Sequence, residues 1–305
     1  MVNVKKWLFK VCEKQWIIGI AQCTMEEVIR NKKIPSSFRW IKPDDSKKSY
    51  ADPFILNISE NKLNLLFEEY TTGRYDGMIK SMTLNSLLEV QAEQTLLKTD
   101  THLSYPFLYF DSGKLYLFPE SGRSGALSGY EYNPRNVAIT NEFIVLNKPL
   151  IDASLLYYQE RYWIFATQLG ESSQKELHIY HSDKLNGHYR AHKMNPVKSS
   201  MNGSRPAGNF ITVDGALYRP SQNCSNYYGE SITIQKIVTL NEEQYQEEVY
   251  CTIPPPRLDR INLGIHTING SGQWVAIDVL IGRLNPFKKI KKYLQRKWAS
   301  IQIMQ

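Results

Sequence analysis

Short, aromatic-rich apolar segments fill residues 38–281, and Gly, Asn and Asp residues separate them. Apolar runs of this length between turn residues are typical of β-strands. The stretch 24–32 differs, because its residues favour a helix that begins after Thr24, a residue type that caps helices well. We therefore expect a helical or closing N-terminal segment over 1–37, followed by an all-β body over 38–281.

A repeated unit organises this body. Each copy has a short motif, an apolar segment, a turn and a second strand. The equivalent positions are Pro53, Pro106, Ala153, Pro206 and His266, at intervals of 53, 47, 53 and 60 residues. Repeats of about 50 residues with four strands each are typical of propeller blades, so the sequence predicts a five-bladed β-propeller. A two-sheet sandwich with coincidental internal similarity is the alternative.

The repeat brings distant polar residues together. In a propeller the first strand of each blade lines the central channel, and its leading residues meet at one mouth. These residues are Asp52, Tyr105, Asp152, Arg205 and Ile265. The second strands add Glu68, Glu120, Thr167 and Gln222 at matching positions. Buried carboxylates without partners cost several kcal/mol, so this convergence indicates ion pairs, a substrate or altered pKa values.

Composition narrows the class of protein. Apolar residues make up 42% of the chain and charged residues 22%, as in soluble globular proteins. The apolar run 16–21 is far shorter than a membrane-spanning helix, and its flanks do not favour a secretory signal. The four cysteines have no CxxC spacing, so we interpret them as reduced thiols of a cytoplasmic protein.

The net charge of +7 belongs to one end of the chain. Residues 282–305 contain seven Lys or Arg and no acidic residue, which leaves residues 1–281 with a formal charge of zero. Beyond Pro286 the tail has helical spacing, with one apolar stripe of Phe287, Ile290, Leu294, Trp298 and Ile301. A basic amphipathic helix of this kind favours peripheral contact with the inner face of a membrane through 283–301. Packing of the stripe on the body is the alternative, and a neutral body argues against nucleic acid as a partner.

Several motifs resemble known families. The segment 50–55, Tyr-Ala-Asp-Pro-Phe-Ile, resembles the first-blade motif of five-bladed glycoside hydrolases related to family 43. A fuller resemblance is to the N-terminal domain of plant glucosamine inositolphosphorylceramide transferase, with similar domains in bacterial surface-polysaccharide proteins. It rests on the segments 52–54, 66–69, 105–107, 119–121, 152–154, 205–208, 219–224 and 228–229. This resemblance spans roughly 38–281 and implies a bacterial surface-polysaccharide member.

One departure from the hydrolases shifts the expected chemistry. The family 43 enzymes carry a Glu acid on a later blade, whereas the fourth blade here presents Arg205 and Arg219. Guanidinium groups match phosphate oxygens in a bidentate manner, which favours an anionic substrate. We therefore expect a glycosyltransferase that moves a sugar, with pentofuranosyl and phosphoribosyl groups among the candidates, from a phosphate-activated donor to a glycan or lipid-linked acceptor.

The expected catalytic residues are Asp52, Asp152 and Glu120. Asp52 would act as general base on the acceptor hydroxyl, and the other two would orient the sugar or tune Asp52. The expected substrate-binding residues are Arg205, Arg219, Glu68, Gln222, Tyr105 and His266. A family 43-like glycoside hydrolase and a non-catalytic glycan-binding propeller are the alternatives.

Structural roles compete with these assignments. Asp52 and Asp152 are also common turn residues, and the two arginines would serve equally as ion-pair partners of the carboxylates. A single His such as His266 is more often a hydrogen-bonded residue than a metal ligand. The sequence thus predicts no metal site and no cofactor, although a divalent ion on a donor diphosphate is compatible with it.

Overall fold

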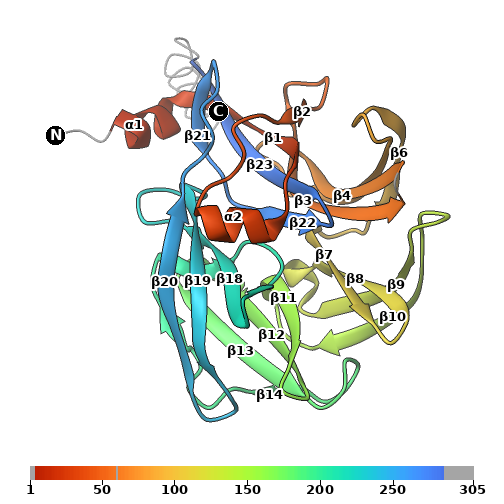
Figure 1. Cartoon of the computed structure of the whole chain (residues 1–305), viewed down its shortest axis with the longest axis vertical. Coiled ribbons are helices and arrows are strands. Elements are labelled where there is room, and N and C mark those ends of the chain that lie inside the picture. The colour runs from red at the N-terminus through yellow and green to blue at the C-terminus, as the bar shows by residue number, and fades with distance from the viewer. Residues whose placement is uncertain (1–3, 60, 285–305) are drawn as a thin grey trace, which may run out of the picture.

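The computed structural model describes residues 4–59 and 61–284, which form five antiparallel sheets around a central axis (Figure 1). This arrangement confirms the predicted five-bladed β-propeller. In the first three blades the strands follow chain order from the axis outward. Each of these sheets therefore presents its first strand to the axis, as the repeat implies.

Three blades use residues 48–199. The first consists of β3 (Lys48–Ser59), β4 (Lys62–Thr71), β5 (Met78–Leu84) and β6 (Val90–Leu97). The second consists of β7 (Ser104–Asp111), β8 (Lys114–Glu120), β9 (Leu127–Asn133) and β10 (Ala138–Leu146). The third consists of β11 (Leu150–Tyr158), β12 (Arg161–Gln168), β13 (Glu176–Ser182), β14 (Arg190–Ala191) and β15 (Lys198–Ser199).

The last two blades each divide the inner strand into two short pieces. The fourth consists of β16 (Asn202–Pro206), β17 (Ile211–Val213), β18 (Ala216–Asn223), β19 (Ser231–Leu240) and β20 (Tyr245–Ile253). The fifth contains β21 (Ile261–Gly264), β22 (Ile268–Ser271) and β23 (Trp274–Leu284), and the N-terminal strands β1 (Cys12–Gln22) and β2 (Arg39–Ile41) complete it.

Strands of the N-terminal segment, which lies before the expected domain boundary at residue 38, belong to the fifth sheet of the propeller. All eleven residues of β1 pair with β23, from Cys12 opposite Leu284 to Gln22 opposite Trp274. This pairing joins the two ends of the ring and buries the apolar run 16–21. The apolar run 16–21 is thus part of β1, the third strand from the axis in the sheet that closes the ring.

Two helices flank this closing sheet. α1 (Val4–Val11) precedes β1, and α2 (Met25–Asn31) lies between β1 and β2. Thr24 caps α2 as expected, and Glu27 completes a capping box with it. Among the described residues, no helix has the length and apolar character needed to cross a membrane.

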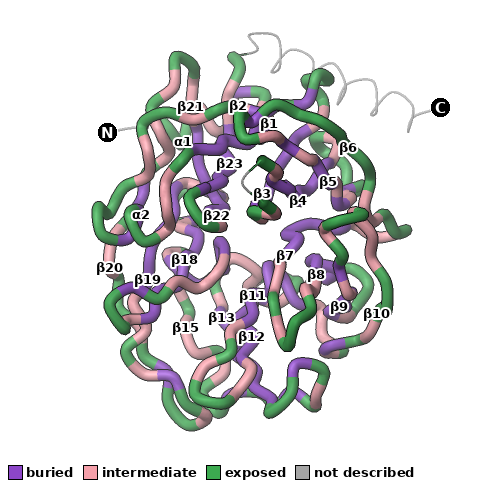
Figure 2. The backbone as a smooth tube through the Cα atoms, turned by 45° about the vertical axis from the view of Figure 1, so that its right-hand side comes forward, coloured by how far each residue is buried: buried purple, intermediate pink, exposed green. Residues whose placement is uncertain are grey.

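Burial falls from the axis outward. Figure 2 shows buried backbone in the strands near the centre and mostly exposed backbone in outer strands such as β6. The inner strands of neighbouring blades contact each other around the axis, and the Ile268 N–H donates to the Ala207 carbonyl between the fifth and fourth blades. This rigid ring fixes the residues at the channel mouth.

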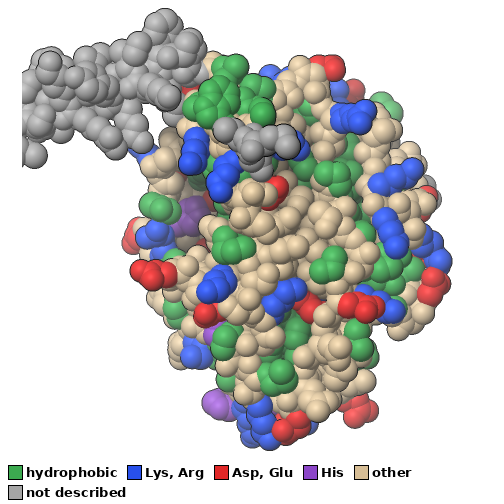
Figure 3. All heavy atoms as spheres, turned by 90° about the vertical axis from the view of Figure 1, so that its left-hand side faces the viewer, with side chains coloured by type: hydrophobic (Ala, Val, Ile, Leu, Met, Phe, Trp, Pro, Cys, Tyr) green, Lys and Arg blue, Asp and Glu red, His purple; other side chains and the backbone are tan. Residues whose placement is uncertain are grey.

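The expected basic tail begins within β23, since that strand continues to Leu284. The proposed amphipathic stripe from Phe287 to Ile301 lies outside the described residues. On the face shown in Figure 3, basic and acidic side chains are interspersed over the described part of the molecule. That distribution matches the formal neutrality of the body.

Candidate functional site

The first strands of three blades share one backbone irregularity at the channel mouth. Asp52, Tyr105 and Asp152 have positive φ angles of 50°, 43° and 50°. At each of them the pairing with the second strand shifts by one residue, so each lies in a β-bulge. Left-handed backbone costs about 1–2 kcal/mol for a residue with a Cβ. A conformation of that cost, repeated in three blades, marks this mouth as a specialised site.

A cavity of about 370 Å³ opens at this mouth. Its lining comes from the first, second, third, fourth and fifth blades and from β1. The polar residues of the lining are Asp52, Glu68, Tyr70, Arg74, Tyr75, His102, Ser104, Glu120, Arg123, Ser173, Arg205, Tyr228 and His266. Five of the predicted site residues thus meet in one cavity: Asp52, Glu68, Glu120, Arg205 and His266.

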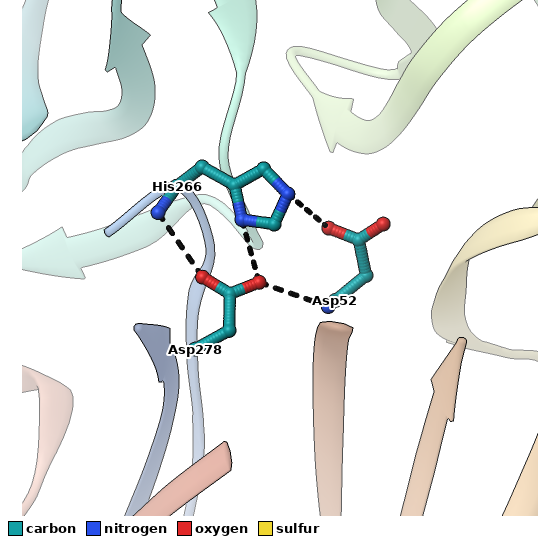
Figure 4. A group of neighbouring side chains, drawn as sticks. All are labelled: Asp52, His266 and Asp278. Atoms are coloured by element: carbon teal, nitrogen blue, oxygen red, sulfur yellow. Dashed lines mark hydrogen bonds and ion pairs between the residues drawn. The ribbon is translucent and has the colours of Figure 1, made fainter. Parts of the chain in front are cut away.

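Asp52 belongs to a buried triad with His266 and Asp278 (Figure 4). The Nδ1 atom of His266 lies 2.6 Å from Asp278 Oδ2, and its Nε2 atom lies 3.6 Å from Asp52 Oδ1. Asp278 Oδ1 also accepts the backbone N–H groups of His266 and Thr267, both at 3.0 Å. Asp278 therefore positions both the imidazole ring and the segment between β21 and β22 that carries it.

The carboxylate of Asp52 is oriented by its own donors. Its Oδ1 atom accepts the Thr267 hydroxyl at 2.6 Å, and its Oδ2 atom accepts the Tyr105 N–H at 3.2 Å. Burial raises the pKa of Asp52 to about 6, while the positive charge of His266 opposes that increase. A carboxyl group with this pKa changes its protonation state near neutral pH, as a general base requires.

The pKa of His266 is also raised. Burial alone would lower it, but the negative charges of Asp278 and Asp52 outweigh burial. His266 stacks on the Trp16 ring with centroids 4.0 Å apart and meets the edge of Tyr228. An imidazolium between two aspartates stabilises their charge inside a water-poor site.

Asp152 and Arg205 form the second ionic unit of the site. Arg205 Nε donates to Asp152 Oδ2 at 2.5 Å, and Gln222 Nε2 donates to the same oxygen at 2.8 Å. The Arg205 guanidinium also lies 5.1 Å from the centre of the Tyr228 ring. Arg205 faces the cavity, but its charge is largely balanced by Asp152.

Glu120 lies beside this unit with one oxygen available. Its Oε2 atom is 3.9 Å from Arg205 Nη2 and makes no hydrogen bond among the described residues. Burial and the nearby Asp152 raise the pKa of Glu120 well above its ordinary value, although Arg205 opposes them. A protonated Glu120 would present a hydroxyl donor to a ligand in the cavity.

Glu68 contacts a histidine that sequence reasoning did not select. The Gly77 N–H donates to His102 Nδ1 at 3.0 Å, so the opposite nitrogen, Nε2, carries the proton. That nitrogen lies 3.3 Å from Glu68 Oε1. Burial and the charge of Asp52 raise the pKa of Glu68 well above its ordinary value, and burial and Arg123 lower the pKa of His102. Both groups therefore tend toward their neutral forms.

Arg219 is not part of the site. It is fully buried within the fourth blade, where its Nη2 atom lies 2.8 Å from Glu247 Oε1. Gln222 is three residues further along β18 and reaches Asp152 instead. Residues three apart in a strand face opposite sides of the sheet, so Arg219 and Gln222 could not both face the channel. The structure therefore does not bring Arg219 into the cavity with Arg205.

Tyr105 contributes its backbone rather than its ring. The ring packs edge-on against Phe54 with centroids 5.0 Å apart, and its hydroxyl lies 2.8 Å from Ser154 Oγ. The side chain is completely buried. Tyr105 therefore holds Asp52 in place through its N–H group, and its ring is not a surface on which a sugar stacks.

Comparison with known proteins identifies the family. Residues 42–273 match the family model described as "Glucosamine inositolphosphorylceramide transferase 1, N-terminal". The chain belongs to this family. Glucosamine inositolphosphorylceramide transferase 1 of rice (Oryza sativa subsp. japonica) is 33% identical over 233 residues, and that of Arabidopsis thaliana is 31% identical over 205. These regions are 73% and 65% of this chain but only 29% and 26% of the relatives.

These transferase relatives are plant proteins, so they do not support the expected bacterial surface-polysaccharide affiliation.

Solved structures show the same fold. An α-L-arabinofuranosidase from Podospora anserina in complex with cellotriose superposes with a TM-score of 0.59 at 9% identity, covering 83% of this chain and 96% of its own. The catalytic domain of a family 62 α-L-arabinofuranosidase from Coprinopsis cinerea gives 0.58 at 11% identity, covering 82% and 98%.

Sequence reasoning missed two central residues of this family member. Asp278 lies on the second strand of the fifth blade, at the position that Glu68 and Glu120 occupy in the first two blades. Alignment of the five repeats therefore contained a signal for it. Trp16 comes from β1, which carries no repeat motif and pairs with a strand more than 250 residues away. No local pattern in the sequence places Trp16 at the mouth.

One cluster of the described residues has the composition of a metal site. Asp52, His266 and Asp278 offer ligand atoms within 4.8 Å of one another. Their atoms are already engaged, because Asp278 contacts the imidazole and three backbone N–H groups and Asp52 accepts two hydrogen bonds. A cation would have to replace the pair between Asp278 and His266. We therefore assign these residues a proton-holding arrangement.

Proposed function

We propose that this chain is a glycosyltransferase that moves a sugar from a phosphate-activated donor to a glycan or lipid-linked acceptor. The observation that carries the proposal is the pair of buried carboxyl groups, Asp52 and Glu120, with raised pKa values in one cavity. The transferase name of the plant relatives supports it, although this chain spans less than a third of their length.

In the proposed reaction Asp52 is the general base. It accepts the proton of the acceptor hydroxyl, whose oxygen forms the new bond to the anomeric carbon. The bond from that carbon to the phosphate oxygen breaks, and the electron pair leaves with the phosphate. His266, held by Asp278, limits the cost of the charge on Asp52 before the transfer. A general base of this kind contributes about 10²–10⁴-fold to the rate.

The remaining polar groups bind the sugar in this proposal. Glu120 and Glu68 offer hydrogen bonds to its hydroxyl groups, while Arg205 and Gln222 hold the buried Asp152 behind the cavity lining. If water replaced the acceptor, the same groups would catalyse hydrolysis, with Glu120 as the acid.

Purified full chain is mixed with nucleotide sugars or phosphoribosyl pyrophosphate and with lipid or oligosaccharide acceptors, and products are followed by mass spectrometry. We expect transfer that Asp52→Asn lowers at least about a hundredfold. Asp214→Asn, an exposed aspartate that pairs with Arg30, is the control and should retain activity. Sugar release without a donor would favour the hydrolase, and glycan binding without turnover would favour the non-catalytic propeller.

Peripheral attachment to an anionic membrane surface, such as the cytoplasmic leaflet, is part of the proposal. In addition to the basic tail, α1 carries Lys5, Lys6 and Lys10, and its Val4 and Trp7 side chains are exposed. Phe9 of α1 stacks on Tyr227, the neighbour of the cavity residue Tyr228, so α1 lies near the mouth. Basic and aromatic residues on one short helix fit a lipid interface.

Flotation with phosphatidylcholine vesicles, with and without phosphatidylserine, tests this attachment. We expect binding that depends on phosphatidylserine and weakens when Trp7→Ala is combined with removal of residues 285–305. Equal recovery with neutral vesicles, or no effect of these changes, would contradict membrane attachment.

A further inference from the structure

Two arginines stand at the rim of the cavity. Arg74 lies between β4 and β5 of the first blade, and Arg123 lies in η1 (Gly122–Ser124), which follows β8 of the second blade. Both are exposed and both line the cavity. Neither guanidinium forms an ion pair within 4.0 Å with a carboxylate of the described residues, and the nearby Asp76 interacts with Arg74 through its charge at a longer distance. Their charges are therefore available to a ligand.

The rim arginines differ from Arg205, which lies deeper. Arg205 has its ion-pair partner in Asp152, whereas Arg123 is held by an aromatic ring. Its guanidinium carbon lies 3.9 Å from the centre of the Tyr75 ring, which meets the His102 ring edge-on at 6.2 Å. Stacking of this kind orients the planar guanidinium and leaves its N–H groups free to bind oxygen atoms.

The cavity is therefore layered by charge. Its deep part contains the carboxyl groups of Asp52, Glu68 and Glu120, and its entrance contains the two unpaired guanidinium groups. The cations in the deep part are already paired with aspartates, whereas the guanidinium groups at the rim are not, so an anionic group gains more at the rim. Sugar hydroxyl groups, which both donate and accept hydrogen bonds, match carboxyl groups.

We propose that Arg74 and Arg123 bind the phosphate group of a phosphorylated sugar or polyol whose neutral ring enters the cavity first. This inference rests on the proposed function and names the substrate class of its site: a phosphate ester with the ring inward. It assigns phosphate recognition to the rim rather than to Arg205 and Arg219. The source of the phosphate is either a soluble activated sugar or a lipid headgroup.

Calorimetric titration of the full chain tests the assignment without turnover. The probes are glucose 1-phosphate, glucose, inorganic phosphate and a uridine diphosphate sugar. Phosphatidylcholine vesicles with phosphatidylinositol provide the lipid-borne arm. The variant is Arg74→Gln with Arg123→Gln, and the control is Arg135→Gln, an exposed arginine between β9 and β10.

We expect a phosphorylated probe to bind at least tenfold more tightly than glucose. The double variant should remove this preference, while Arg135→Gln should leave it intact, because a charge-assisted hydrogen bond accounts for about tenfold or more. The arm that shows the arginine-dependent preference, soluble or vesicle-borne, identifies the source. Equal affinity for phosphorylated and plain probes, or a preference that survives the double variant, overturns the proposal.

These results are separable from those of the proposed function. If phosphate binding depends on the two arginines but no sugar transfer occurs, the assignment of phosphate binding to Arg74 and Arg123 stands and the proposed transferase activity is rejected. If the double variant still transfers sugar with an unchanged KM for the donor, the proposed transferase activity stands and the assignment of phosphate binding to Arg74 and Arg123 is rejected. A circular dichroism melt of the double variant equal to that of the wild type excludes unfolding, since both side chains are exposed.

Discussion

Asp278 accepts the backbone N–H of Asp52 at 2.9 Å, although 226 residues separate the two in the chain. This bond joins the second strand of the last blade to the first strand of the first blade. The same carboxylate contacts His266, so the step that closes the ring also positions the proposed base. Ring closure and the proposed catalysis thus involve the same buried side chain.

Replacement of Asp278 by Asn should cost about 3–5 kcal/mol of unfolding free energy, because it leaves buried N–H groups and an imidazolium without their carboxylate. The pKa of His266 should fall, since Asp278 is the strongest of the groups that raise it. Urea denaturation measures the first effect and NMR titration of His266 the second. A variant as stable as the wild type would show that the carboxylate is not structural.

The activity should have an acidic limb near pH 6. A general base must be ionised, and burial raises the pKa of Asp52 to about 6. We expect kcat/KM to fall about tenfold per pH unit below that value. The pH dependence of kcat/KM measures this limb, and a limb near pH 4 would argue against Asp52 as the base.

Stability should change with pH in the opposite direction. The folded state holds a proton on Asp52 more tightly than the unfolded chain, where an aspartate ionises near pH 4. The contribution of Asp52 is therefore present at low pH and lost as the pH rises from about 4 to about 6. His266 acts in the same sense, because its raised pKa adds stability that is lost as the pH rises through that pKa. Asp52→Asn cannot ionise and resembles the protonated form, so its melting temperature should match that of the wild type below about pH 4 and exceed it above about pH 6.

The repeat made the fold and much of the site predictable. A blade cannot bury its two faces alone, so five copies imply a ring, and the ring brings Asp52, Asp152 and Arg205 together. The closing strand β1 was not predictable in this way. Its partner lies at the other end of the chain, and its apolar run has no blade motif.

The errors within the site have a common physical origin. A blade motif assigns residues to a strand, but the alternation of side chains decides which of them face the channel. Arg219 and Gln222 occupy one strand and opposite faces, which the motif alone does not separate. Asp278 was missed because the fifth repeat has His266 where the other repeats have Pro or Ala. The second strand of that repeat was therefore not aligned with the strands that carry Glu68 and Glu120.

Arg219 should therefore matter for stability. Replacement of Arg219 by Met leaves Glu247 with Lys198 as its one cationic partner among the described residues, which should cost about 3–5 kcal/mol of unfolding free energy. The double change Arg219→Met with Glu247→Leu removes both charges and should recover most of the loss. Urea denaturation of the wild type and of these two variants measures the loss and its recovery. Unchanged stability of Arg219→Met, with a raised KM for the donor, would return Arg219 to the site.

Glu68 and Glu247 form a matched pair, because both are buried glutamates with opposite electrostatics. Burial raises the pKa of Glu68, whereas Arg219 and Lys198 lower the pKa of Glu247 despite its burial. Burial thus favours the neutral form of Glu68, which glutamine resembles, so Glu68→Gln should change the unfolding free energy by less than about 1 kcal/mol. Glu247→Gln removes a charge that two cations need and should cost about 3 kcal/mol. Denaturation at pH 7 compares them, and equal losses would mean that Glu68 is ionised in the folded protein.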